Sequence, residues 1–170
     1  VDLLHALDVA ALKIPSGEID NLNFLAHAGR TGRPVILSTG MSNLSEVEAA
    51  VRTIESTGNS QLVILHCVSS YPSPVNETNL RAIETLAAAF PYPIGYSDHT
   101  PGVEIPWAAV ARGAVMIEKH FTLDRTADGP DHQASLEPNE LIEMVRGIRS
   151  IELAMGDGVK RAQPCEEDCR

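Results

Sequence analysis

Hydrophobic residues gather in short, continuous runs that recur along the chain. Continuous apolar runs, in contrast to alternating ones, are typical of strands that are covered on both faces, as in a parallel sheet. The pattern therefore predicts five strands, at residues 10–14 (AALKI), 34–39 (PVILST), 62–68 (LVILHCV), 93–97 (PIGYS) and 115–121 (VMIEKHF).

Segments with helical spacing separate these runs. Apolar side chains recur every three to four positions in residues 44–54, 80–87 and 141–148, which predicts helices with one buried face. Ser42 or Ser45 is expected to cap the first of these helices. Glycines stand where helices should end, at Gly32, Gly58 and Gly113.

Strands followed by helices at intervals of roughly 21 to 31 residues indicate βα units. Two parallel architectures fit this pattern, a doubly wound sheet and a (β/α)8 TIM barrel. No G-x-G-x-x-G sequence follows any predicted strand, which weakens the dinucleotide-binding version of the doubly wound sheet. Polar residues at or just past the strand ends favour the barrel, because those ends meet at one mouth.

The number of strands limits how much of a barrel the chain can form. A (β/α)8 barrel needs eight strands and about 250 residues, whereas the sequence predicts five strands in 170 residues. Residues 1–7 are helix-like without a preceding strand, and the sequence after Gly158 is polar. We therefore expect an α/β fold that is a partial TIM barrel, about the last five βα units of a larger protein, with open sheet edges.

Composition and charge exclude some classes of function. The chain is 44% hydrophobic and 21% charged, as in an ordinary globular protein. Thirteen Lys and Arg against 23 Asp and Glu give a net charge of −10, which argues against nucleic-acid binding. Basic residues are scattered and no apolar run approaches the roughly 18 residues of a membrane span, so no membrane partner is expected. The sparse cysteines predict a reducing cytoplasm and no disulfide framework; they are Cys67, Cys165 and Cys169.

Two histidines end successive predicted strands. His99 and His120 would lie close together at a barrel mouth, where two neutral imidazoles could bind a divalent metal. Asp98 and Glu118 could orient the rings or act as ligands. The alternative is a pair of hydrogen-bonded core histidines. His66 lies deeper in an apolar strand and is interpreted as a core residue.

Lys13 follows the first strand and precedes Ser16 and Gly17. A lysine at a barrel mouth can form a Schiff base with a carbonyl substrate or bind a phosphate or carboxylate. The third interpretation is a surface lysine whose stem packs on the protein. The small residues beside it favour anion binding, because they let an oxyanion approach the backbone.

Two loops carry further candidates. Tyr71, in a proline-rich loop after the third strand, could contact a sugar-like ligand or belong to a rigid turn. The polar loop after His120 carries three carboxylates that could bind sugar hydroxyls or be solvated charges. They are Asp124, Asp128 and Asp131.

Six motifs occur together in an order and spacing that resemble one protein family, the sialic acid synthases (N-acetylneuraminate synthase and its bacterial relatives). The resemblance covers essentially the whole chain. It implies a TIM barrel followed by a small antifreeze-like domain. Residues 1–158 would be the C-terminal portion of the barrel and residues 159–170 the start of a linker or tail, without the first strands or the C-terminal domain. The motifs are KIPSGEI (13–19), PVILSTGMS (34–42), HCVSSYPSP (66–74), GYSDHTPG (95–102), EKHFT (118–122) and GPDHQASLEP (129–138).

The resemblance also implies an activity. In the family, phosphoenolpyruvate condenses with the open-chain aldehyde of N-acetylmannosamine or a related hexosamine, and phosphate leaves. The family uses a divalent metal, Mn²⁺, Mg²⁺ or Co²⁺. Its members are expected to be cytoplasmic homodimers that bind neither nucleic acid nor membrane.

The motifs assign roles to individual residues by the same resemblance. His99 and His120 match the metal ligands and, with Glu18, the catalytic residues. Tyr71 and Asp131 match residues near the amino sugar. Many family members have Asn where this chain has Ser69. Serine can still donate to a phosphate oxygen, but its side chain is shorter. The residues that match the phosphoenolpyruvate site are Lys13, Ser16, Ser69 and Ser97.

Three functions therefore stay open from the sequence. The first is a sialic acid synthase, of which this chain is a part. The second is a related pseudaminic, legionaminic or 9-phosphate synthase, and the DHQASLEP stretch (131–138) favours the sialic or legionaminic branch by resemblance. The third is a non-catalytic binding remnant. Because site residues of the family lie on the first three strands, residues 1–170 alone are expected to be inactive.

Overall fold

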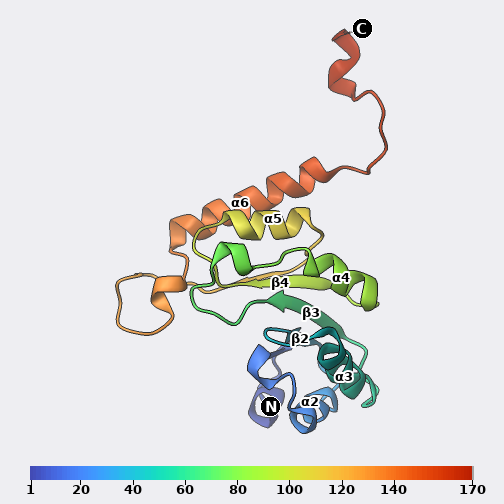
Figure 1. The fold of residues 1–170 in the computed structure, drawn as a ribbon, viewed down its shortest axis with the longest axis vertical. Helices are drawn as coiled ribbons and strands as arrows, with labels where there is room; N and C mark the ends of the chain where they lie inside the picture. The colour runs from blue at the N-terminus through green and yellow to red at the C-terminus, as the bar shows by residue number, and fades with distance from the viewer. Residues whose placement is uncertain (170) are drawn as a thin grey trace.

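A computed structural model describes residues 1–169 and contains a single five-stranded parallel sheet. The strand order in the sheet is the order along the chain, and each strand pairs in parallel with the next. The sheet curves into half of a barrel, as predicted (Figure 1). Its strands are β1 (Leu12–Ile14), β2 (Val35–Ser38), β3 (Leu62–Cys67), β4 (Ile94–Asp98) and β5 (Ile117–Lys119).

Helices alternate with the strands, so the βα repeat read from the sequence is confirmed. In Figure 1, α5 and α6 lie side by side at the β4–β5 end of the sheet, and α2 and α3 lie together at the other end. The helices are α1 (Asp2–Ala6), α2 (Leu22–Gly29), α3 (Leu44–Glu55), α4 (Ala82–Ala89), α5 (Glu104–Ala111) and α6 (Pro138–Met155). Four short 3₁₀ helices occupy loops, at Ser16–Glu18, Val75–Glu77, His132–Ala134 and Pro164–Cys169.

The main core lies between the sheet and its helices. Val35, Leu37 and Ile64 of the central strands are fully buried, in keeping with their continuous apolar runs. The three-to-four spacing in α3 buries one face of that helix, whose buried residues are Val47, Ala50, Val51 and Ile54. Burial of this apolar surface is the main stabilising contribution to the fold.

The helix ends differ from the prediction at one point. Asn43, and neither Ser42 nor Ser45, caps α3: its side chain accepts hydrogen bonds from the backbone N–H groups of Ser45 and Glu46. Glu46 in turn accepts from the N–H of Asn43, which completes a capping box. The glycines predicted at helix ends are confirmed by their positive φ angles, +70° at Gly32, +85° at Gly58 and +98° at Gly113.

The last strand is shorter than its apolar run. β5 pairs with β4 over three residues only, and Phe121 instead forms an isolated bridge with Leu136. This bridge closes a long loop, 122–135, which Figure 1 shows projecting from the body of the protein. Within residues 1–169, no helix has both the length and the apolar character needed to cross a bilayer.

Gly95 in β4 tests how tightly the curved sheet is packed. A Cβ at this position would lie 2.5 Å from Leu65 Cδ2 and 2.6 Å from the Met116 carbonyl oxygen. We expect Gly95→Ala to lower the free energy of unfolding by about 1–3 kcal/mol, the usual cost of overpacking. Gly17→Ala is the control, because its Cβ would meet nothing within 4 Å. Equal stability of the two variants in urea titrations of the complete protein would contradict this packing.

Candidate functional site

A cavity of about 330 Å³ lies at the carboxyl ends of the strands. This is where ligands bind in parallel α/β barrels. All five strands or the loops that follow them contribute to its wall. The lining residues are Lys13, Pro15, Ser16, Ser38, Cys67, Tyr71, Ser97, Asp98, His99, Glu118, Lys119 and His120.

One side of the cavity is a cluster of three aromatic rings. The ring centroids of His99 and His120 are 5.4 Å apart, so the predicted proximity of the two histidines is confirmed. Tyr71, from the loop after β3, lies against both, at 4.2 Å from His99 and 5.6 Å from His120. Burial raises the pKa of the Tyr71 hydroxyl, so Tyr71 is a neutral donor at physiological pH.

The tautomer of His99 follows from its hydrogen bond. Nδ1 lies 2.8 Å from the Val68 carbonyl oxygen, and a carbonyl can only accept, so Nδ1 carries the proton. Burial is the main cause that lowers the pKa of His99, and the nearby His120 lowers it further. His99 is therefore neutral, with the lone pair of Nε2 available. Metal-binding histidines commonly donate their other ring N–H to a carbonyl oxygen in this way, which fixes the tautomer and the orientation of the ring.

The ring nitrogens of His99 and His120 could bind a divalent metal whose other ligands come from substrate or water. Neutral imidazole is a common ligand of divalent metals, and two of them lie side by side here. No group of three His, Cys, Asp or Glu side chains suited to a metal occurs in the described part of the chain. The two histidines would thus supply two positions and leave others for substrate or water.

The polar loop places one predicted carboxylate beside the rings. Asp131 Oδ2 is 4.0 Å from Nδ1 of His120. The loop is held at its base by Arg125, which bonds the Ser135 carbonyl oxygen and the Glu140 carboxylate. Asp124, by contrast, accepts hydrogen bonds from Thr126 within its own turn. Of the residues predicted near an amino sugar, Asp131 and Tyr71 are therefore both next to the histidines.

Another part of the cavity lining carries a lysine, a serine and a carboxylate in contact. Ser97 Oγ donates to Glu118 Oε1 at 2.7 Å, and Lys13 Nζ is 3.5 Å from the same oxygen. Lys13 also donates to the Ile14 carbonyl oxygen at 3.0 Å. Two of the predicted anion ligands thus converge on one point, which a carboxylate of the protein occupies.

Two further serines meet beside this group. Ser16 Oγ and Ser69 Oγ are 2.7 Å apart, although 53 positions separate them in the sequence. Gly40 makes the approach of their loops feasible, because a Cβ there would lie 2.3 Å from Ser16 Cβ and 2.5 Å from Ser69 Oγ. Gly40 also has a φ of +49°, which favours glycine. The β1, β2 and β3 loops therefore come together around a residue without a side chain.

Some predicted residues take other positions. Glu18 accepts a hydrogen bond from Asn21 Nδ2 at 2.9 Å and is not among the cavity-lining residues. Asp98 orients neither imidazole; its carboxylate bonds Thr100 and Lys119. The prediction that Asp98 orients the rings is wrong, because both of its carboxylate oxygens are bonded to Thr100 and Lys119.

Sequence reasoning missed Ser38 as a site residue. Its side chain lines the cavity, it is 2% exposed, and its Oγ has no hydrogen-bond partner among the described residues. A buried hydroxyl without a partner is costly unless a ligand or water satisfies it. The signal in the sequence was its place at the end of a strand, shared with the residues that were selected.

Known proteins resemble this chain along nearly its whole length. It matches the family described as the NeuB family over residues 1–160. It is 50% identical over 169 residues to the N,N'-diacetyllegionaminic acid synthase of Campylobacter jejuni, covering 98% of this chain and 51% of that protein. It is 41% identical over 170 residues to the N-acetylneuraminate-9-phosphate synthase of Homo sapiens, covering 99% of this chain and 47% of that protein. The chain thus spans about half the length of the curated relatives it matches.

Solved structures agree with the fold. The N-acetylneuraminic acid synthetase of Leptospira borgpetersenii, in complex with citrate, superposes with a TM-score of 0.92 at 43% identity, covering 98% of this chain and 58% of that one. A 3-deoxy-D-arabino-heptulosonate 7-phosphate synthase of Thermotoga maritima superposes with a TM-score of 0.77 at 22% identity, covering 91% of this chain and 63% of that one, a likeness of fold alone.

His66 gives a test of the core around the site. It is 9% exposed and its Nε2 donates to the Thr78 carbonyl oxygen at 2.8 Å, which confirms its interpretation as a core histidine. Burial lowers its pKa below the usual 6.5. Its contribution to stability is therefore complete above pH 6.5 and is lost as the pH falls toward the folded-state pKa. We expect His66→Gln, which keeps a donor but cannot be protonated, to flatten the fall of unfolding free energy between pH 7.5 and 5.5. Parallel profiles of the two proteins would contradict this.

Proposed function

Because the chain belongs to the NeuB family, we propose that it carries the active site of a nonulosonic acid synthase. In this reaction phosphoenolpyruvate condenses with the open-chain aldehyde of N-acetylmannosamine or a related hexosamine, and phosphate is released. The observation that supports it best is one cavity with two chemically distinct sides. An anion-binding side contains Lys13 and Ser97, and an imidazole–tyrosine side contains His99, His120 and Tyr71.

Phosphoenolpyruvate would bind on the anion side. Lys13, Ser16 and Ser97 would donate to its phosphate and carboxylate oxygens and fix the position of its C3. The substrate oxygens would replace the Glu118 carboxylate, which holds Lys13 and Ser97 in the absence of an anion. Ser38 is a further donor, since its hydroxyl has no hydrogen-bond partner in the described part of the chain and lines the same cavity. In this arrangement Lys13 is an electrostatic clamp and forms no Schiff base.

The hexosamine would bind on the other side, between Tyr71 and Asp131. Tyr71 offers a neutral hydroxyl and an aromatic face, and Asp131 accepts hydrogen bonds from sugar hydroxyls. The aldehyde carbon would then face C3 of phosphoenolpyruvate. Attack of C3 on the aldehyde carbon would form the new C–C bond, convert the aldehyde oxygen to a hydroxyl and leave positive charge at C2. Water would add at C2, and the proton that it loses balances the proton taken up by the aldehyde oxygen. The C2–O bond to phosphate would then break and give the keto acid and phosphate.

His99 and His120 would hold a divalent metal, Mn²⁺, Mg²⁺ or Co²⁺, through Nε2 of His99 and a ring nitrogen of His120. Such a metal acts as a Lewis acid toward a carbonyl oxygen. The contribution of the chain is to keep His99 neutral through the Val68 carbonyl and through burial. Tyr71 packs against both rings.

A legionaminic acid synthase is the second candidate within the same reaction. The identity to N,N'-diacetyllegionaminic acid synthases is 50% in Campylobacter jejuni and 48% in Legionella pneumophila, against 41% to N-acetylneuraminate-9-phosphate synthase of Mus musculus and 37% to pseudaminic acid synthase of Helicobacter pylori. Relative turnover of the corresponding hexosamines decides between the branches.

The direct test is release of phosphate from phosphoenolpyruvate. We expect the complete protein to release phosphate only when both a hexosamine and Mn²⁺ are present. His99→Ala should lower the rate at least about 100-fold, while His27→Ala, a matched change at an exposed histidine of α2, should not. Residues 1–170 alone should release none. Phosphate release that persists in His99→Ala would contradict the proposal.

Lys13→Ala tests whether the two substrates bind at different sides of the cavity. Loss of a charge-assisted hydrogen bond costs about 1.5–3 kcal/mol, so the KM for phosphoenolpyruvate should rise roughly 10- to 150-fold. The KM for the hexosamine should change little, and Lys160→Ala at an exposed position is the control. Borohydride should trap no adduct between Lys13 and a substrate; a trapped adduct would identify an aldolase with a Schiff base instead.

A further inference from the structure

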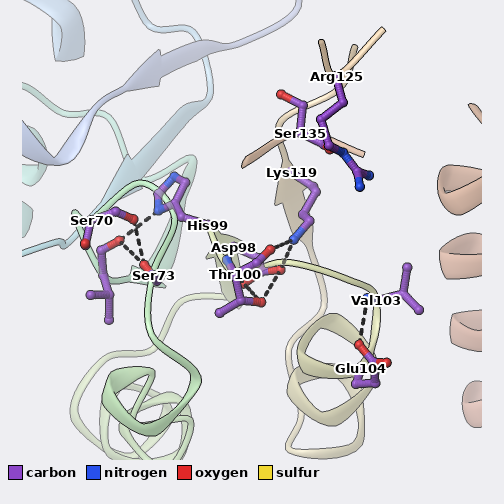
Figure 2. A network of polar contacts seen from close by, with 11 residues as sticks. Ser70, Ser73, Asp98, His99, Thr100, Val103, Glu104, Lys119, Arg125 and Ser135 are labelled. Carbon is purple, nitrogen blue, oxygen red and sulfur yellow. Dashed lines mark hydrogen bonds and ion pairs between the residues drawn. The ribbon is translucent and has the colours of Figure 1, made fainter. Parts of the chain in front are cut away.

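A buried ion pair joins the ends of β4 and β5 directly behind the two histidines. Nζ of Lys119 is 2.5 Å from Asp98 Oδ2, and the side chains are 3% and 0% exposed (Figure 2). The two residues are also register partners, opposite each other on neighbouring strands. The pair is the deepest charged contact of this wall, and the proposed chemistry does not use it.

The alternation of side chains along a strand sets the pair apart from Ser97 and Glu118. Ser97 and Glu118 are register partners whose side chains meet in the cavity. Asp98 and Lys119 follow each of them by one residue and form a separate, buried pair that also borders the cavity. His99 and His120 come one residue later. The ion pair thus lies directly before the two imidazoles along both strands.

Lys119 is bonded to both residues that flank His99. Besides Asp98, it donates to the carbonyl oxygen of Thr100. Asp98 Oδ1 in turn accepts from the backbone N–H of Thr100 at 3.0 Å and from its Oγ1 at 2.9 Å. One side chain, adjacent to His120, therefore fixes the segment 98–100 on both sides of His99.

The β3 side holds His99 in a complementary way. Its backbone carbonyl oxygen accepts from the N–H of Ser73 at 2.8 Å, and its ring donates to Val68. Figure 2 shows the imidazole turned toward this loop and the Asp98 side chain turned toward Lys119. The ring orientation of His99 is set by β3, whereas its separation from His120 is set across β4 and β5.

Stability alone gives no reason for such a pair. Removing two charges from water costs about as much as their attraction returns, and apolar replacement of a buried pair is often neutral. An apolar pair cannot supply the five hydrogen bonds that join Asp98, Thr100 and Lys119 in a fixed geometry. The Asp98–Lys119 pair therefore does more to fix the position of segment 98–100 than to stabilise the fold.

We propose that Lys119, acting through Asp98 and Thr100, is a positioning residue that sets the separation of His99 and His120. This inference rests on the proposed function only in assigning a metal to the two histidines. Displacement of reacting groups by about 1 Å is enough to reduce rates about 100-fold, so the spacing matters to any ligand the rings share.

The test uses two variants of the complete protein. Asp98→Leu/Lys119→Met removes both charges together, and Lys119→Arg keeps the charge but changes the geometry of the donors. We expect crystal structures without metal to show the ring centroids displaced by about 1 Å or more from the present 5.4 Å. Titration with Mn²⁺ alone should show roughly 10- to 100-fold weaker binding, the usual effect of a lost supporting contact. The melting temperature of the double variant should stay near that of the wild type.

The exposed pair Arg149–Glu152 on α6 provides the matched control. Arg149→Met/Glu152→Leu removes the same two charges far from the cavity and should leave ring separation and Mn²⁺ binding unchanged. Unchanged ring separation in Lys119→Arg, or in the folded double variant, would overturn the inference. If the wild type itself bound no Mn²⁺, the proposed metal function would fail, and the ring separation in the metal-free crystals would still decide the positioning role.

Discussion

The parallel register between β4 and β5 is the constraint on which the candidate site depends. It places Ser97 opposite Glu118 and Asp98 opposite Lys119, and the next residues along the two strands are His99 and His120. Because side chains alternate between faces, a slip by one residue would move these side chains to the other face of the sheet. The pairing of the β4 and β5 backbones therefore determines where the two imidazoles lie.

The charge distribution shows how an acidic protein can prepare a site for an anion. The chain carries a net charge of −10, yet Lys13 is held at the cavity with Glu118 as its local counter-ion. The carboxylate occupies the donors of Lys13 and Ser97 that an anionic substrate would need. The lysine is thus kept in place by a contact that a better acceptor can replace. The electrostatic potential at one site can therefore differ in sign from the net charge of the protein.

Sequence reasoning predicted the elements whose causes are local or periodic. Five strands and the proximity of His99 and His120 followed from continuous apolar runs and from the convergence of parallel strand ends. It did not predict that Asn43 would cap α3, since several neighbouring residues could serve and only the backbone geometry selects one. Nor could it find the partner of Asp98, because a contact across strands depends on register, which apolar patterning does not specify to one residue. The role of Glu18 stays a prediction: a motif does not give the direction of a side chain, and at the end of the 3₁₀ helix Ser16–Glu18 this carboxylate accepts a hydrogen bond from Asn21.

The cavity also divides its chemistry between the two ends of the sheet. β1 and β2, with the loop after β3, supply small hydroxyl groups and a lysine, brought together where Gly40 has no side chain. β4 and β5 supply the imidazoles and the ion pair behind them. The loop after β3 contributes to both ends, because Ser69 meets Ser16 while Tyr71 lies on the histidines. This loop therefore links the position of the serine hydroxyls to that of the aromatic cluster, and the proposed condensation between two separately bound substrates would require such a link.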